Sequence, residues 1–147
     1  MRVLVQEAPF DLAEETARFA KGEGGSGAIV TFTGVVRDND AGTLSAMEIE
    51  HYPGMTEKAL REIAQQAVTR FKLQDALVIH RYGRLVPGEQ IMMVATAARH
   101  RRHAFEAAEF LMDYLKSRAP FWKREITAEG EAWVAAKDED EAALERW

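Results

Sequence analysis

One amphipathic helix constrains the fold of this 147-residue chain more than any other feature of its sequence. After Thr56, apolar side chains recur at the three- and four-residue spacing of a helix, at Leu60, Ile63, Ala64, Ala67, Val68 and Phe71. We expect Thr56 to cap this helix at its N-terminus. A helix with a single apolar face has to bury that face against another layer, so strands are expected on either side of it in the sequence.

The flanking segments have the alternation and the β-branched or aromatic content of strands. The expected strands span residues 2–6, 28–36, 46–51, 77–82, 90–97 and 121–127. Further helices are expected over residues 11–20, 100–117 and 139–147, and Trp133-Val134 is left unassigned. Pro120 disfavours helical geometry at Ala119, so the helix before it should end there. Because short turns join strands between helices, the sequence predicts an α+β fold, with a mainly antiparallel sheet and packed helices, in a single compact domain over residues 1–147.

Composition excludes several classes of function. The chain has no cysteine, which rules out disulfides, thiolate zinc sites and cysteine nucleophiles. Its formal net charge of -5 argues against a general nucleic-acid-binding protein. No apolar run approaches the roughly 20 residues of a membrane helix, and Met1 to Phe10 lacks the layout of a signal peptide. We therefore expect a cytoplasmic protein with no metal, no cofactor, no nucleic-acid partner and no membrane partner.

Positive charge nevertheless gathers in two places. Residues 99–103 are rich in arginine and histidine at an expected helix start, where cations oppose the helix dipole. An anion bound there would relieve this conflict, although the side chains could also simply reach into solvent. Lys116 and Lys123 stand on either side of Pro120, so they could converge from different elements. Taken alone, Lys116 is better explained as a cation that favours a helix C-terminus.

Two further groups of residues have an open interpretation. Arg37 follows the strand 28–36 beside a turn, a usual place for a binding group, but, taken alone, it is better explained as a solvated arginine. His100 and His103 could share one helical face, yet no acidic residue has a suitable spacing to complete a metal site. These residues alone leave open both whether the chain binds an anion and what chemistry it performs.

Several segments together resemble the large, catalytic subunit of molybdopterin synthase. The matching segments keep the family's order and spacing from about Ala28 to the C-terminus, at residues 31–37, 50–60, 100–101, 104–107, 112–125 and 146–147. The segment 112–125 is the most specific of these. The resemblance implies a hammerhead-like α+β fold and a sulfurtransferase.

The resemblance also implies partners and a substrate. In this family two large subunits form a homodimer, and each binds one ubiquitin-like small subunit, which makes a heterotetramer. The C-terminal Gly-Gly tail of the small subunit carries a thiocarboxylate. Its sulfur is transferred to cyclic pyranopterin monophosphate, which forms the molybdopterin dithiolene during molybdenum cofactor biosynthesis.

Site residues follow from the same resemblance. The catalytic residues would be Lys116 and Lys123. The substrate-binding residues would be Val35, Val36, Arg37, His100, Arg101, Lys116, Lys123, Arg124 and Glu125. Phe32 and Met112 would contact the tail of the small subunit. Lys137 stands where an arginine of the family reaches the neighbouring subunit's substrate, and a lysine there would keep the charge but lose the two-pronged grip on phosphate.

Electrostatics favours Lys116 as the principal acid and base. Positive charges at Arg37, Arg101 and Lys123 would disfavour a further ammonium and so lower the pKa of Lys116. Lys123 would then support charge and orientation, while arginine forks would hold the phosphate.

Two alternatives of other classes remain. One is a non-catalytic adaptor that only receives the tail of a ubiquitin-like partner. The other is an RNA- or nucleotide-binding module that uses Arg101, Arg102 and Trp122, and the negative net charge disfavours it.

Overall fold

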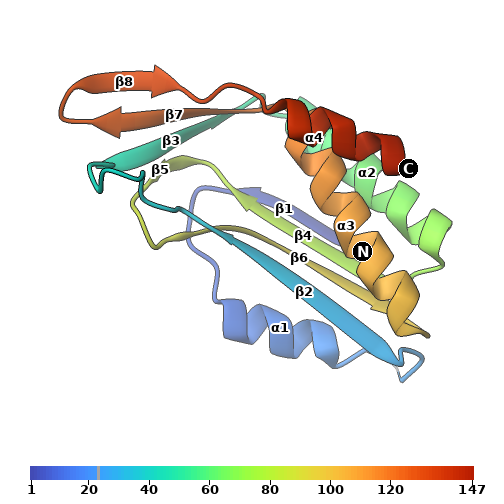
Figure 1. Ribbon diagram of the computed structural model, residues 1–147. Coiled ribbons are helices and arrows are strands. Elements are labelled where there is room, and N and C mark those ends of the chain that lie inside the picture. Colours follow the sequence, from blue (N-terminus) through green and yellow to red (C-terminus); the bar gives the residue numbers. More distant parts are fainter. Residues whose placement is uncertain (23) are drawn as a thin grey trace.

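The computed structural model describes residues 1–22 and 24–147 and has an α+β fold, as the sequence predicts (Figure 1). Its first sheet has the strand order β1-β4-β6-β2. These strands are β1 (Arg2–Gln6), β4 (Asp75–Arg81), β6 (Gln90–Ala98) and β2 (Ala28–Val35). β1 and β4 are parallel and the other two pairs are antiparallel.

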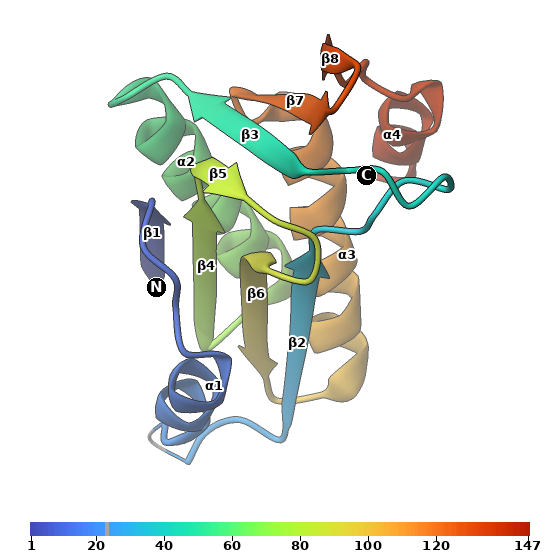
Figure 2. The same cartoon turned by 90° about the vertical axis from the view of Figure 1, so that its left-hand side faces the viewer.

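The second sheet crosses one end of the first (Figure 2). It has the order β5-β3-β7-β8, and all its pairs are antiparallel. Its strands are β5 (Gly83–Leu85), β3 (Ala46–His51), β7 (Phe121–Thr127) and β8 (Gly130–Trp133). With one parallel pair in the two sheets described, the prediction of mainly antiparallel pairing is confirmed.

Helices cover both faces of the first sheet. α1 (Leu12–Ala20) lies on one face, while α2 (Met55–Phe71) and α3 (Arg101–Arg118) lie side by side on the other (Figure 1). α4 (Asp138–Ala143) and a 3₁₀ turn (Leu144–Arg146) follow β8 and pack on α3. No helix in the described part of the chain is long and apolar enough to cross a membrane.

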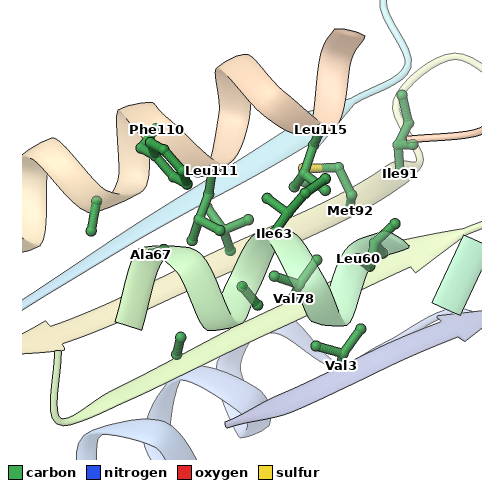
Figure 3. Packing of buried hydrophobic residues seen from close by; sticks show 14 of the residues in the cluster. Val3, Leu60, Ile63, Ala67, Val78, Ile91, Met92, Phe110, Leu111 and Leu115 are labelled. Carbon is green, nitrogen blue, oxygen red and sulfur yellow. The ribbon is translucent and has the colours of Figure 1, made fainter. Parts of the chain in front are cut away.

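The main core lies between the first sheet and the pair α2 and α3 (Figure 3). α2 contributes Leu60, Ile63 and Ala67, as its helical spacing predicts. These side chains meet residues of α3 and of the sheet, including Phe110, Leu111, Leu115, Val3, Val78 and Met92. A large apolar side chain buried in this way stabilises the fold by about 1.5–3 kcal/mol.

The cap of α2 differs from the expectation. Gly54 takes the N-cap position with φ 83°, a backbone conformation that favours glycine, and its N–H donates to the Glu57 carboxylate at 2.8 Å. Thr56 lies inside the first turn and is fully buried, and its hydroxyl donates to the Tyr52 carbonyl at 2.9 Å. The prediction that Thr56 caps the helix is therefore wrong, because its hydroxyl instead ties the helix to the loop after β3.

Candidate functional site

One side of α3 carries several of the predicted residues. Helical spacing places Arg101, Phe105, Met112 and Lys116 along one stripe. Phe110, on the opposite flank of α3, contacts Phe71 of α2, so the stripe lies on the flank that faces β2. The stripe therefore lies beside β2, the edge strand of the first sheet.

The two ends of this stripe lie far apart. Arg101 begins α3 and Lys116 lies in its last turn, so a rise of 1.5 Å per residue separates them by about 22 Å along the helix. His100 is the N-cap of the same helix and stays with Arg101. The expectation that Arg101 lies close to Lys116 is thus not met within one chain, because a straight helix cannot bring its ends together.

Arg37 lies at the Lys116 end. β2 begins beside the start of α3, where the Gly27 N–H donates to the Ala98 carbonyl at 2.9 Å. β2 then rises by about 26 Å over its length and α3 by about 27 Å, and both run in the same direction from there (Figure 2). Arg37 is exposed just beyond β2 and Val35 is 49% exposed beside it, so both could reach a ligand at this end.

Val36 has a structural position instead. Its side chain is only 2% exposed and belongs to the main core. Its N–H donates to the Glu89 carbonyl and its carbonyl accepts the Gly88 N–H, both at 2.8 Å. The geometry therefore does not support the predicted substrate contact of Val36.

Lys123 lies on the inner face of β7. It is half-buried opposite Ile49 of β3, and alternation along the strand puts Glu125 on the same face. Burial lowers the pKa of Lys123, and the charge of Lys116 lowers it further. Asp140 raises this pKa and Lys137 lowers it. The structure thus brings Lys116 and Lys123 together, as expected, and it places two residues of the C-terminal segment close to them.

Lys137 acts on its own chain in this arrangement. It is the N-cap of α4, which packs on α3. Its positive charge, like that of Lys116, lowers the pKa of Lys123. The sequence predicts a contact of Lys137 with the neighbouring subunit. The described chain places this residue near Lys123 of its own subunit, and the contact with the neighbouring subunit stays a prediction.

Arg124 lies on the other face of β7. Its guanidinium forms ion pairs with Glu131 at 2.8 Å and Glu50 at 3.3 Å, and it lies 5.1 Å from the centre of the Trp133 ring. Successive residues of a strand point to opposite faces, so Arg124 and Lys123 cannot both direct their side chains to one ligand. The predicted substrate contact of the Arg124 side chain has no support in this arrangement.

An exposed apolar strip leads to Lys116. Phe32 of β2 is 42% exposed and lies opposite Val94, whose side chain is in the main core, so Phe32 is on the α3 side of the sheet. Phe105 is 60% exposed on the α3 stripe, and Met112 is half-buried one helical turn before Lys116. Phe32 and Met112 were predicted and Phe105 was missed, although its helical spacing from Met112 would have revealed it.

Two cavities lie elsewhere. A cavity of about 260 Å³ is lined by Pro9, Phe10, Arg81, Gly88, Glu89 and Gln90. A second of about 380 Å³ is lined by Gln65, Gln66, Thr69, Arg70, Phe110 and Tyr114. Neither is lined by a predicted site residue. Over residues 1–22 and 24–147, no three histidine or acidic side chains gather in a way that could hold a metal ion.

Comparisons with known proteins agree with the resemblance. A family model described as MoaE protein matches residues 5–118. A molybdopterin synthase catalytic subunit of Cereibacter sphaeroides is 69% identical over 147 residues, which is all of both chains. One of Ralstonia nicotianae is 57% identical over 146 residues, covering 99% of this chain and 83% of the relative. These relatives extend beyond the family model and include the segment of Lys123.

Solved structures show the same fold. A MoaE protein of Burkholderia ambifaria, described as a molybdopterin biosynthesis protein, superposes with a TM-score of 0.84 at 51% identity, over 99% of this chain and 96% of that one. A molybdopterin synthase structure from Staphylococcus aureus gives a TM-score of 0.82 at 28% identity, over 90% and 96%. The family model covers most of the chain and the first relative covers all of it, so this chain belongs to the MoaE family of molybdopterin synthase catalytic subunits.

Proposed function

We propose that the chain moves sulfur from the C-terminal thiocarboxylate of a ubiquitin-like small subunit to cyclic pyranopterin monophosphate, at the pair Lys116 and Lys123. The thiocarboxylate sulfur attacks a carbon of the pterin side chain and an oxygen leaves that carbon, either as the phosphate oxygen of the opened cyclic ester or, after taking up a proton, as water. A thioester then joins carrier and pterin. Water then adds to the acyl carbon, the carbon–sulfur bond to the carrier breaks, and the carrier leaves as a carboxylate. Two such transfers give the dithiolene, and both need a group that moves protons.

The position of Lys123 carries this proposal. Burial and the neighbouring charge of Lys116 lower its pKa, so more of the amine is neutral near pH 7 and able to accept a proton. This observation favours Lys123 for the acid and base role that the sequence assigns to Lys116. The exposed Lys116 then interacts with the anionic tail of the carrier and with the phosphate.

The apolar strip provides a path for the tail. Phe32, Phe105 and Met112 line the route beside β2, and the route ends at Lys116. An edge strand presents unpaired backbone groups, and an extended peptide can bind to them. We therefore place the Gly-Gly end of the carrier at the lysines and the preceding residues along this strip.

The phosphate-binding part of the site comes from two subunits. His100 and Arg101 lie about 22 Å from Lys116 along α3, too far to share a small ligand with it. In a homodimer the start of α3 of one subunit can face the lysine pair of the other. We propose that the partner copy provides these two residues, while Arg37 and Glu125 come from the subunit that holds the lysines.

The catalytic role is tested with purified protein, thiocarboxylated small subunit and cyclic pyranopterin monophosphate. Lys123→Ala and Lys116→Ala should each lower dithiolene formation by about 100-fold or more, since a positioned proton-transfer group contributes about 10²–10⁴-fold. Lys58→Ala changes an exposed lysine of α2 and serves as the control. Near-normal turnover in Lys123→Ala would refute the role. Dithiolene formation by the wild-type chain would exclude a non-catalytic adaptor.

The two-subunit site is tested by mixing two inactive variants. Refolded mixtures of Lys116→Ala and Arg101→Ala subunits contain mixed dimers with one intact site if Arg101 acts across the interface. About a quarter of wild-type activity should then return. If Arg101 acts within its own subunit, every site stays defective and no activity returns.

Besides the roles of the site residues, two expectations from the sequence remain predictions. These are the cytoplasmic location and the action of residues 1–147 as one domain.

A further inference from the structure

A stack of rings lies behind Lys123, where the two sheets meet. His80 of β4 stacks on Phe121 of β7, with ring centroids 3.7 Å apart and planes inclined by 16°. His51 of β3 is the partner of Phe121 in the strand register, and its ring centroid lies 4.2 Å from that of Tyr82. Phe121 precedes Lys123 by two residues on the same face of β7. The rings therefore hold the segment that carries Lys123 against the first sheet.

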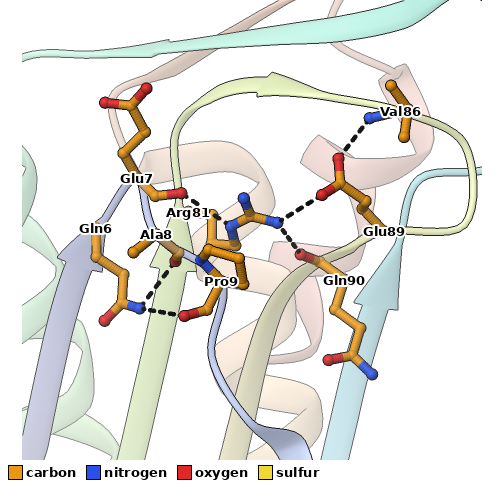
Figure 4. A network of polar contacts seen from close by, with 8 residues as sticks. All are labelled: Gln6, Glu7, Ala8, Pro9, Arg81, Val86, Glu89 and Gln90. Atoms are coloured by element: carbon orange, nitrogen blue, oxygen red, sulfur yellow. Dashed lines mark hydrogen bonds and ion pairs between the residues drawn. The ribbon is translucent and has the colours of Figure 1, made fainter.

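The His80 ring is itself held in place. Its Nδ1 lies 2.8 Å from the Arg81 carbonyl oxygen, and because a carbonyl only accepts, this nitrogen carries the proton. The Arg81 guanidinium donates to the carbonyls of Glu7 at 3.1 Å and Gln90 at 3.2 Å, and it lies 3.6 Å from the Glu89 carboxylate (Figure 4). Arg81, whose carbonyl accepts the His80 hydrogen bond, is therefore held in place. This in turn fixes the plane of the imidazole.

The His80 ring is also uncharged at neutral pH. Burial lowers its pKa from 6.5 to about 3; the hydrogen bond to Arg81 opposes this shift, and the charges of Lys123 and His51 add to it. A neutral ring adds no positive charge beside Lys123 and fills space that water would otherwise enter. Since burial is the main cause of the lowered pKa of Lys123, the packing behind that amine matters for its chemistry.

We propose that His80 is a positioning residue for Lys123: its stack on Phe121 fixes the strand that presents the amine, and its ring keeps water from the space behind it. The inference rests on the proposed function only in giving Lys123 a part in the reaction. The physical coupling between the imidazole and the amine exists whether or not sulfur is transferred.

Two substitutions distinguish the contribution of the His80 ring from that of its hydrogen bond. His80→Asn keeps a donor near the place of Nδ1 and removes the ring, whereas His80→Phe keeps the ring and removes the donor. The pKa of Lys123 is measured by NMR titration of ¹³C-dimethylated lysines in the full chain, with its signal identified by its loss in Lys123→Arg. We expect His80→Asn to raise this pKa by about one unit, because water reaches the amine. His80→Phe should leave it equal or lower it.

The reaction should follow the same shift. In His80→Asn, kcat should fall about tenfold at fixed pH, whereas the KM for the pterin should stay within about twofold of the wild-type value. This kcat should recover when the pH is raised by one unit. A merely structural role would not produce this recovery. If the pKa shifts and sulfur transfer does not change, the catalytic role of Lys123 is refuted while the positioning by His80 stands.

Ile79→Ala is the matched control. Ile79 precedes His80 in β4 and is fully buried on the opposite face, toward α1, so its truncation destabilises the same strand without touching the ring stack. The proposal is overturned if His80→Asn leaves the pKa of Lys123 unchanged, or if Ile79→Ala shifts it equally. Should His80→Asn fail to fold, Phe121→Leu removes the other half of the stack. That variant must raise the same pKa, and an unchanged value overturns the proposal as well.

Discussion

The two sheets of this chain differ in what their strands contain. β4 and β6 of the first sheet are buried almost throughout, with mostly apolar side chains. β7 of the second sheet has ionisable residues on both faces, with Lys123 and Glu125 inward and Arg124 outward. The lysine with the lowered pKa therefore lies on the charged sheet, at the point where that sheet meets the apolar one.

This difference between the sheets indicates how the chain can maintain a lowered pKa at Lys123. Burial is the main cause of the lowered pKa of Lys123, and burial requires neighbours that hold their positions. The first sheet contributes His80 to that packing and gains its stability mainly from the apolar contacts of its core. Damage to the first sheet should thus reduce stability, whereas changes at the junction should affect the chemistry of Lys123.

The largest expected effect is in the core of the first sheet. Phe110 is 1% exposed and contacts Phe71 edge to face at a centroid distance of 5.5 Å. Phe110→Ala should lower the free energy of unfolding by about 3–5 kcal/mol, through lost burial and the cavity left behind. Urea unfolding measures this loss. The pKa of Lys123 should not change at temperatures where the variant is folded. A shift of that pKa would show that the core of the first sheet and the lysine site are not independent.

A smaller effect is expected at the junction, as a dependence of stability on pH. His80 titrates near 6.5 in the unfolded chain and at about 3 in the folded one. Between these values only the unfolded chain binds the proton, so stability falls as the pH drops from 6.5 toward 3, by up to about 1.4 kcal/mol per unit. Above pH 6.5 both states are neutral and the contribution vanishes. Urea unfolding at pH 7, 6 and 5 should show this slope in the wild type and a reduced slope in His80→Phe; equal slopes would contradict it.

Local patterns made most of this fold predictable. Helical spacing located α2 and α3, and alternation located β3, because each pattern reflects burial of one face. β5 was not predicted, since three residues are too few to show a period. The cap at Gly54 was missed because it depends on a positive φ that the preference for threonine as a cap does not reveal.

The site was only partly predictable, for geometric reasons. The residues on either side of Pro120 correctly indicated that Lys116 and Lys123 converge. The distance between Arg101 and Lys116 follows from helix length, and the outward direction of Arg124 follows from strand alternation. Family resemblance names residues without saying which subunit or which face presents them. The His80 contact joins positions 41 residues apart, on different sheets, and no local pattern contains it.

The C-terminal segment should contribute less than the junction. The Trp147 ring lies 5.6 Å from Phe110 and 5.7 Å from Phe71 between centroids, and its Nε1 donates to Asp113 at 2.7 Å. Trp147→Ala should lower the free energy of unfolding by about 1–2 kcal/mol, since the ring is half-buried and one hydrogen bond is lost. Hydrogen exchange should accelerate at the amides of α4 and remain unchanged in β4. Equal acceleration in both would show that the segment and the first sheet unfold together.

The smallest effect is expected on the outer face of the second sheet. The ion pairs of Arg124 with Glu131 and Glu50 are partly exposed, and pairs of this kind contribute about 0–1 kcal/mol. A double-mutant cycle of Arg124→Gln and Glu131→Gln, followed by urea unfolding, should give a coupling below about 1 kcal/mol that weakens with added salt. The pKa of Lys123 should stay unchanged, because the guanidinium points away from it. A loss of pterin binding in Arg124→Gln, at unchanged stability, would mean that the two faces of β7 are not separate and that the sequence-based role of Arg124 is correct.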